Sequence, residues 1–245
     1  MPHRLPRGVD RARACEGQVN ARPQRRYRLD FRQLVLAERP ASLLDIGCGG
    51  GSLLRWFAKG GVHAEGLDPD PAAVRALGDA GYRARVGRAE TLPFADGAFD
   101  VVAAEFSAHH FEDLGRALAE AQRVARRAVW LLDPWYDESL GSQRLMLRWD
   151  RWFKRIDRRQ GMVHNEVLAV ADFVAALKDV APERLEFRHW LRLVPVDLAW
   201  FDRESAEHGT LASPEELEEL AAVRAEAERD GLTDDGAIVV RIAVG

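Results

Sequence analysis

Short apolar runs alternate along the chain with segments whose apolar residues recur at helical spacing. The apolar runs predict strands at 43–47, 62–68, 82–87, 99–106, 128–132, 185–194 and 238–244. The helical patterns fall at 27–38, 52–59, 71–80, 114–127 and 166–180. Strands that alternate with helices indicate a parallel sheet covered by helices on both faces. We therefore expect an α/β fold: a three-layer, doubly wound (Rossmann-like), mostly parallel seven-stranded sheet with an antiparallel last strand and helical insertions after strands five and six.

A glycine-rich loop follows the first predicted strand, in the run LLDIGCGGG from Leu43 to Gly51. Alternate glycines allow a tight turn and leave backbone N–H groups bare at the start of the next helix, where a ligand can approach closely. Asp68 ends the second strand, 21 residues after Gly47. A carboxylate at that place can accept hydrogen bonds from ribose hydroxyls. Together the two features predict a nucleoside-cofactor site, and an ordinary strand-to-helix turn is the alternative.

The spacing of the glycines distinguishes between two cofactors. The order is GxGxG, beginning at Gly47, and Ser52 stands where a dinucleotide-binding GxGxxG motif has its third glycine. Asp45, just before the loop, would repel a pyrophosphate but would favour a sulfonium or an amino group. S-adenosylmethionine therefore suits this loop better than NAD.

The loop resembles motif I of the class I S-adenosylmethionine-dependent methyltransferases. The stretches RAETLPFADGAFD at 88–100 and FSAHHF at 106–111 are similar to the type 11 branch of that family, which includes ubiquinone and menaquinone C-methyltransferases. The resemblance covers residues 40–135. It implies S-adenosyl-L-methionine as the cofactor, bound by Asp45, Gly47, Cys48, Gly49, Asp68, Pro69, Ala89, Glu90, Leu92 and Glu105.

One departure from the family pattern lies beside the expected adenine site. In the related enzymes an Asp often precedes the Ala-Glu pair and contacts the adenine amino group, whereas this chain has Arg88. The resemblance then leaves the Ala89 backbone and Glu90 to supply this contact. Leu92 and Phe94 are expected to pack near the ring.

Two histidines follow the fourth predicted strand, at the edge of the sheet where substrate should meet cofactor. A sulfonium methyl group is already activated, so the enzyme mainly aligns a nucleophile and excludes water. A phenol, amine or enol acceptor is helped by one general base, and histidine has a suitable pKa. His109 and His110 are therefore the candidate catalytic residues, as bases or substrate contacts. The alternative is that they bond to the backbone and hold the loop.

Two segments exceed what the sheet and its helices need, at about 134–165 and 195–236. Long insertions at the ligand edge are often functional. The first insertion predicts a helix with one aromatic face, which would either cover a planar or apolar substrate or pack on the sheet. The candidate substrate contacts are Asp133, Trp135, Tyr136, Trp149, Trp152, Phe153 and His164.

The cysteine content argues against a disulfide framework and against a metal site. The two cysteines, Cys15 and Cys48, offer no metal-ligand cluster. Cys48 has no adjacent His and acid that would make it a nucleophile. We therefore expect no metal ion, and we interpret Cys48 as a small residue of the glycine loop.

Charge is distributed unevenly along the 245 residues. Residues 1–32 contain nine arginines and three acidic residues, although the whole chain has a net charge of −4. We predict a basic, disordered tail over 1–26 and a single methyltransferase domain over 27–245, with its core at 40–135. The acidic remainder disfavours nucleic acid as a partner. With no signal-peptide core and no run of about eighteen apolar residues, a cytoplasmic protein without a membrane span is expected.

These observations predict an enzyme that transfers a methyl group from S-adenosylmethionine to a small, aromatic or apolar molecule. The sequence leaves open whether the acceptor atom is carbon, oxygen or nitrogen, and it leaves open the oligomeric state. A non-catalytic protein that binds S-adenosylmethionine as a sensor or partner subunit is the alternative from another class. The GxGxG order disfavours a third possibility, an NAD(P)-dependent oxidoreductase on the same sheet.

Overall fold

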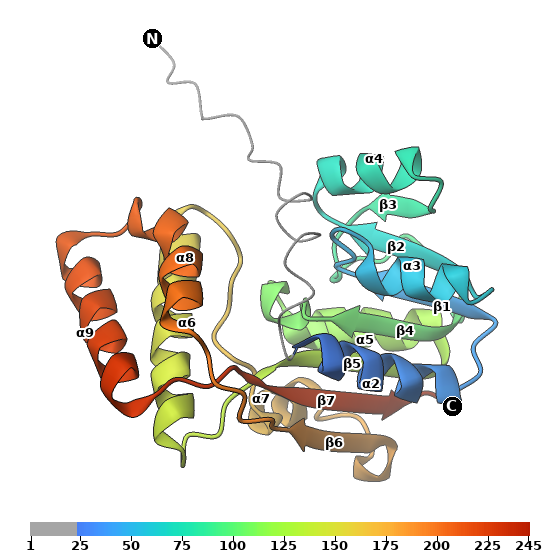
Figure 1. Ribbon diagram of the computed structural model, residues 1–245. Helices are drawn as coiled ribbons and strands as arrows, with labels where there is room; N and C mark the ends of the chain where they lie inside the picture. Colours follow the sequence, from blue (N-terminus) through green and yellow to red (C-terminus); the bar gives the residue numbers. More distant parts are fainter. Residues whose placement is uncertain (1–23) are drawn as a thin grey trace.

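The computed structural model describes residues 24–245 and contains one seven-stranded sheet (Figure 1). The strands are β1 (Ser42–Ile46), β2 (His63–Asp68), β3 (Ala84–Val86), β4 (Phe99–Glu105), β5 (Ala125–Trp135), β6 (Leu185–Trp190) and β7 (Gly236–Ala243). Their order across the sheet is β3-β2-β1-β4-β5-β7-β6. The first five strands pair in parallel, and β7 runs antiparallel to both β5 and β6. The predicted fold class is confirmed, including its antiparallel last strand.

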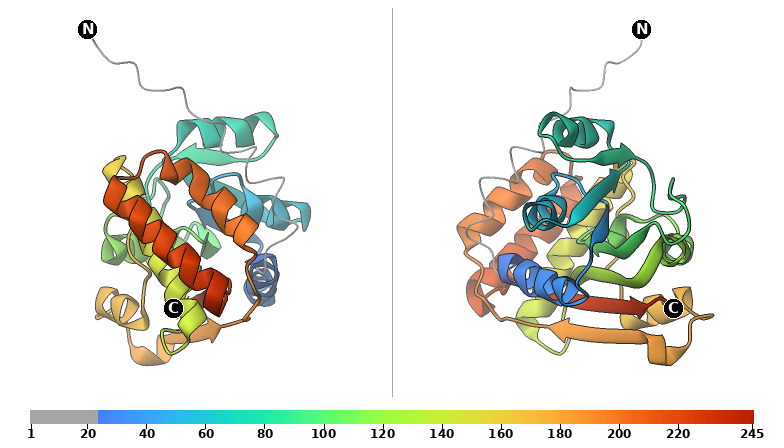
Figure 2. Two further views of the ribbon diagram at one scale, coloured as in Figure 1. Left: turned by 60° about the vertical axis from the view of Figure 1, so that its left-hand side comes forward. Right: turned by 90° about the vertical axis from the view of Figure 1, so that its right-hand side faces the viewer.

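Helices cover both faces of the sheet and also extend beyond one edge (Figures 1 and 2). The α-helices of the described residues are α2 (Gln24–Ala37), α3 (Ser52–Lys59), α4 (Pro71–Asp79), α5 (Leu114–Val124), α6 (Gly141–Arg159), α7 (Val170–Ala176), α8 (Leu198–Gly209) and α9 (Pro214–Asp230). Two short 3-10 helices, η1 (Ala108–His110) and η2 (Pro182–Arg184), complete the list. Apolar residues of α2, α3 and α4 pack on one face, and those of α5 and α7 pack on the other.

Both faces of the central strands are buried, which explains why these strands read as continuous apolar runs. Successive side chains of a strand point to opposite faces. Leu43 and Val101 join the core under α2 and α3, whereas their neighbours Leu44 and Val102 join the core under α5, and all four are fully buried. A parallel sheet covered on both sides needs this pattern.

The largest differences from the predicted boundaries lie at β5 and α7. Strand β5 begins at Ala125, before the predicted 128–132, because Ala125 pairs with Phe99 of β4. It ends at Trp135, beyond the predicted end, because its pairing with β7 continues to that residue. Helix α7 is shorter than the predicted 166–180. The segment before it is held extended along the rim of the sheet, where Asn165 donates its backbone N–H to His109 O and its side-chain Nδ2 to Phe111 O.

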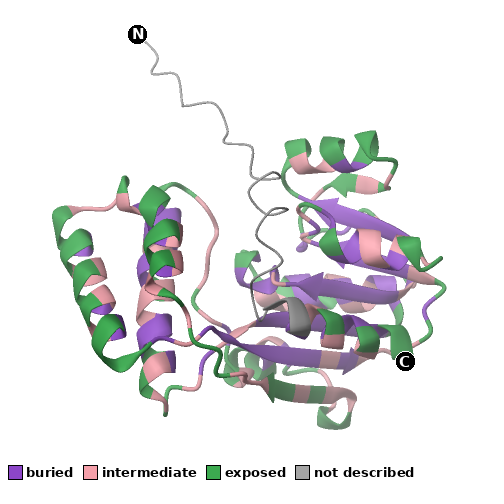
Figure 3. Ribbon diagram, viewed as in Figure 1, coloured by how far each residue is buried: buried purple, intermediate pink, exposed green. Residues whose placement is uncertain are grey.

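Helices α6, α8 and α9 form a third layer of helices, separate from the two that cover the faces of the sheet (Figures 1 and 2). This layer lies at the carboxyl ends of the parallel strands and has its own apolar core. The inner faces of these helices are buried and their outer faces are exposed (Figure 3). Trp152 of α6 is fully buried and donates its Nε1–H to Glu216 O of α9, and the Phe153 ring stacks on His208 of α8 at 3.5 Å. The aromatic face of α6 therefore packs mainly on α8 and α9, and not on the sheet.

The proposed tail at 1–26 and Cys15 lie, up to residue 23, outside the described residues. Helix α2 already begins at Gln24, three residues before the predicted start of the leading helix. Among the described residues, no helix is both long enough and apolar enough to cross a membrane.

Candidate active site

The glycine loop joins β1 to α3 at the carboxyl edge of the sheet. Gly47 and Cys48 donate their backbone N–H groups to Leu67 O of β2, at 2.8 and 3.1 Å. Gly47, Gly49 and Gly51 all have positive φ, at 69°, 46° and 75°, which L side chains rarely adopt. A Cβ built on Gly47 would lie 2.5 Å from the Ser107 Cβ, whereas one built on Gly49 would meet no atom within 4 Å. The loop therefore opens onto free space at Gly49, as a cofactor cradle requires.

Asp68, at the end of β2, holds the tip of this loop. Its Oδ2 accepts the Gly49 N–H at 2.7 Å and its Oδ1 accepts the Asp70 N–H at 2.9 Å. Each carboxylate oxygen accepts more than one hydrogen bond. The ribose hydroxyls of a nucleoside thus have acceptors here that the backbone keeps in place. Pro69 is exposed beside Asp68.

A second pair of carboxylates, Asp45 of β1 and Glu105 of β4, lies buried beside the loop. Asp45 accepts the Leu54 N–H of the first turn of α3 at 3.0 Å. Burial and the nearby charge of Glu105 raise the pKa of Asp45 to about 8. A raised pKa means that negative charge is costly here, so this pocket favours a cation. The ammonium and sulfonium groups of S-adenosylmethionine are both cationic.

Two arginines of α2 bind Glu105. Arg32 reaches it with two bonds, Nε to Oε2 at 2.8 Å and Nη2 to Oε1 at 2.7 Å, and Arg28 also forms an ion pair with it. The Arg28 guanidinium lies 4.7 Å from the centre of the Phe106 ring. Sequence reasoning missed both arginines, although their four-residue spacing on a helix was a signal that they share one face.

The Glu90 carboxylate binds the backbone just before α5. Its Oε1 accepts the Glu112 N–H at 2.7 Å and the Asp113 N–H at 3.3 Å, just before α5. Arg88 pairs with Glu112 at 2.6 Å and approaches the other oxygen of Glu90 at 3.7 Å. The Glu90 carboxylate is thus engaged by protein groups, and an adenine contact by Ala89 and Glu90 stays a prediction.

Leu92 and Cys48 are buried packing residues next to the cradle. Leu92 belongs to the core under α5, and its N–H donates to the Glu120 carboxylate at 2.8 Å. Cys48 is a free, buried thiol, and a Cβ built on Gly66 would lie 2.7 Å from its sulfur. Burial raises the pKa of Cys48, so the thiol is not an activated nucleophile.

Three histidines meet at the rim formed by η1 and the segment between α6 and α7. The His109 Nδ1 lies 2.8 Å from Asp133 Oδ1 and both residues are buried. The His110 Nδ1 lies 2.7 Å from Val163 O, and the His164 Nδ1 lies 2.7 Å from Asp157 Oδ2. Desolvation, and the charge of His109, lower the pKa values of His110 and His164. Both imidazoles are therefore neutral near pH 7.

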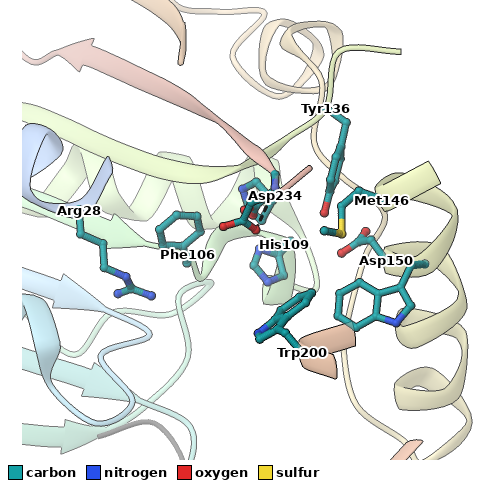
Figure 4. A pocket seen from close by; sticks show the side chains of 11 residues that line it. Arg28, Phe106, His109, Tyr136, Met146, Asp150, Trp200 and Asp234 are labelled. Atoms are coloured by element: carbon teal, nitrogen blue, oxygen red, sulfur yellow. Dashed lines mark hydrogen bonds between the residues drawn. The ribbon is translucent and has the colours of Figure 1, made fainter. Parts of the chain in front are cut away.

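A cavity of about 200 Å³ opens between the edge of the sheet and the third layer of helices (Figure 4). Its lining residues are Arg28, Phe106, His109, Pro134, Tyr136, Met146, Trp149, Asp150, Trp200, Asp234 and Asp235. Aromatic rings and carboxylates face one another across it (Figure 4). Trp149 is held by α8, because its Nε1–H donates to Ser205 Oγ at 2.8 Å.

Of the predicted substrate contacts, Tyr136 and Trp149 line this cavity, and Asp133 reaches it through His109. Trp152 and Phe153 do not line it, because they fill the packing between α6 and the other two helices of the layer. The packing of these two residues therefore does not support the prediction that they contact substrate.

Trp135 and His164 also lie outside the lining of the cavity. Trp135 packs on His189 at 4.3 Å, and His164 stacks near His109. Sequence reasoning missed Trp200 and Asp234, which come from the second insertion and carry no local motif.

The fold and the cradle define a class of protein: a doubly wound α/β domain that binds a nucleoside cofactor at the carboxyl edge of its sheet. Residues 44–132 match the family model described as a methyltransferase domain. This part of the chain is similar to the class I S-adenosylmethionine-dependent methyltransferases, for which S-adenosylmethionine is the cofactor. The open loop at Gly49, the carboxylate of Asp68 and the cation-favouring pocket at Asp45 all fit this cofactor.

Two curated relatives and one solved structure illustrate the similarity. The demethylmenaquinone methyltransferase of Chlorobaculum parvum is 33% identical over 108 residues, which are 42% of this chain and 45% of the relative. The ajmaline N-methyltransferase of Rauvolfia serpentina is 27% identical over 167 residues, which are 63% of this chain and 56% of the relative. The YcgJ protein of Bacillus subtilis has a similar fold, with a TM-score of 0.61 and 18% identity over 88% of this chain and 98% of that one. The chain spans about a third to a half of the length of the curated relatives it matches.

Proposed function

We propose that this protein transfers a methyl group from S-adenosylmethionine to a small molecule bound in the cavity between the sheet and helices α6, α8 and α9. The observation that carries the proposal is the position of this cavity beside the cofactor cradle. Phe106 and His109 line the cavity, and Ser107 between them touches the glycine loop at Gly47. A molecule in the cavity therefore lies next to the cofactor.

The walls of the cavity favour a small aromatic acceptor that carries an ionisable hydroxyl or amino group. Trp149, Trp200 and Tyr136 offer flat apolar surfaces. Asp234 and Asp235 add negative charge to the lining. Such a lining suits a planar molecule with a polar or basic substituent better than a purely apolar one.

We infer that His109 removes the proton from the acceptor. A carboxylate only accepts hydrogen bonds, so the His109 Nδ1 donates to Asp133 and the Nε2 carries the lone pair. In this arrangement the His109 Nε2 would accept the proton that the acceptor heteroatom loses on methylation. Buried Asp133 then stabilises the imidazolium that forms. The bound cofactor supplies the activated methyl group, while this chain aligns the acceptor and excludes water.

Calorimetry with S-adenosylmethionine, S-adenosylhomocysteine and NAD tests the cofactor first. We expect the two methionine-derived ligands to bind the wild type, and both to be lost in Asp68→Ala and in Gly49→Val. Gly49→Val should fail for two reasons. The backbone φ of +46° is one that L side chains rarely adopt, and the valine side chain would enter the space of the cradle. Binding of NAD alone would instead support the oxidoreductase.

An acceptor screen with the wild type and His109→Ala then tests the reaction. Turnover on aromatic hydroxyl or amino compounds, lost in the variant at unchanged cofactor affinity, supports the proposal. Tight cofactor binding without turnover on any compound of these classes would favour a non-catalytic sensor or partner subunit.

A further inference from the structure

We propose that His109, His110 and His164 bind a divalent transition metal ion, with zinc as the expected ion, at the rim of the cavity. One ring nitrogen of each histidine lies within 4.8 Å of those of the other two. The ring centres are 4.2, 4.4 and 5.2 Å apart. The two cysteines play no part in this cluster, which is why a search for cysteine-based metal motifs did not find it.

The partners of the three rings leave one nitrogen of each free to bind the ion. The Nδ1 atoms of His109, His110 and His164 contact a carboxylate, a backbone carbonyl and a second carboxylate, and none of these groups donates a hydrogen bond. Each Nδ1 must therefore carry the proton. When such a ring is neutral, its lone pair is on Nε2, so the oxygen partners select the tautomer that binds a metal ion through Nε2.

The oxygen partners also match what surrounds histidine ligands in metalloproteins. A ligating histidine almost always donates its second ring N–H to a carboxylate, a backbone carbonyl or water, which fixes the direction of the ring. Asp133 serves His109, and Asp157 serves His164 while also accepting from His208 Nε2 at 3.0 Å. Both carboxylates are buried. The support for the three rings is thus built into the fold.

The geometry needs only small movements to hold the ion. Zinc binds imidazole nitrogen at about 2.0–2.1 Å, so three ligands of a tetrahedral site lie roughly 3.3 Å from one another. His110 is exposed and His164 comes from an extended segment, so both rings can turn toward buried His109. Three neutral nitrogen ligands suit zinc and its neighbours among the transition metals better than magnesium or calcium.

A bound ion would have two consequences. It would tie the segment between α6 and α7 to η1, because His164 lies on the first and the other two ligands on the second. It would also place a fourth, open coordination position next to a residue that lines the cavity. There the ion could bind an acceptor hydroxyl and lower its pKa, using the same His109 nitrogen that otherwise removes the proton. This second consequence rests on the proposed function, whereas metal binding itself does not.

Zinc titration of the full chain, after dialysis against a chelator, tests the site. We expect one tight site per chain, and a loss of affinity of at least about 100-fold in His110→Ala and in His164→Ala, because removal of a ligand should exceed the cost of removing an oxygen partner. Asp157→Asn should weaken binding by about 10- to 100-fold. His63→Ala is the matched control, because this exposed histidine begins β2 at the opposite edge of the sheet.

Two further readouts separate loss of the site from misfolding and from loss of activity. Cobalt bound in place of zinc should give the visible absorption of a tetrahedral ion in the wild type and not in the two histidine variants. Zinc should raise the Tm of the wild type and of His63→Ala but not that of His110→Ala or His164→Ala, while all variants keep the wild-type affinity for S-adenosylhomocysteine. An absence of zinc binding, or equal binding by all variants, would overturn the metal site and leave the methyltransferase proposal standing.

Discussion

Binding of S-adenosylmethionine should release one proton from the protein, and Asp45 is the group that we expect to lose it. Burial and the charge of Glu105 raise the pKa of Asp45 to about 8, so this carboxyl is about 90% protonated at pH 7 in the free protein. The cofactor brings two cationic groups to this pocket, and a nearby cation favours the charged form of a carboxyl. The pKa of Asp45 should therefore fall toward its ordinary value when the cofactor binds.

The size of the effect follows from these two pKa values. Between pH 6 and pH 7, cofactor binding should release close to one proton. The observed affinity for the cofactor should therefore rise about tenfold per pH unit in this range and level off near pH 8. Calorimetry in buffers of different ionisation enthalpy measures the number of protons directly. In Asp45→Asn the release should vanish and the affinity should no longer depend on pH. Equal proton release by the wild type and by this variant would refute the assignment.

The same pKa also affects folding. Between about pH 4 and pH 8 the folded protein keeps a proton on Asp45 that the unfolded chain has lost. The contribution of this group to stability is therefore complete below about pH 4 and is lost as the pH rises through 8. Urea unfolding without cofactor should show a steeper decline in stability over this range for the wild type than for Asp45→Asn.

Three other substitutions test the cavity and the third layer of helices. Asp133→Asn should lower kcat by about 10²- to 10⁴-fold without changing cofactor affinity, because His109 loses its orienting carboxylate. The control Asp137→Asn, at a half-buried position just before a turn, should leave kcat unchanged. Trp149→Ala should raise the KM for an aromatic acceptor and not the Kd of the cofactor, and an unchanged KM would place the acceptor elsewhere. Trp152→Ala should cost about 3–5 kcal/mol in urea unfolding, since this side chain is fully buried, and a loss below about 1 kcal/mol would contradict the packing described for α6.

The core of the fold and the glycine loop of the cofactor site were predictable from the sequence because local patterns determine them. Helix α3 has the predicted bounds, and β1, β2 and β4 each end within one residue of their predicted ends. Apolar runs mark such elements directly, and glycines mark the turns between them. The positive φ values at Gly47 and Gly49 likewise express a property of glycine that the sequence displays.

The tertiary structure decided which of the remaining residues meet. The helical spacing of Trp149, Trp152 and Phe153 predicted an aromatic face, but only the packing of α8 and α9 shows that the last two are covered and the first lines the cavity. Glu90 matched a family motif, but only the structure shows that its carboxylate accepts a hydrogen bond from the backbone just before α5. Both outcomes depend on elements that are distant in the chain.

The sequence by itself determined the class of fold, the glycine cradle and the carboxylates at the ends of β1 and β2, because these follow from residue type and short-range order. Only the tertiary structure brought His164 to His109 and His110, across more than fifty residues, and oriented each ring through its own oxygen partner. No local pattern encodes such a meeting, because it depends on how the extended segment before α7 lies along the rim of the sheet.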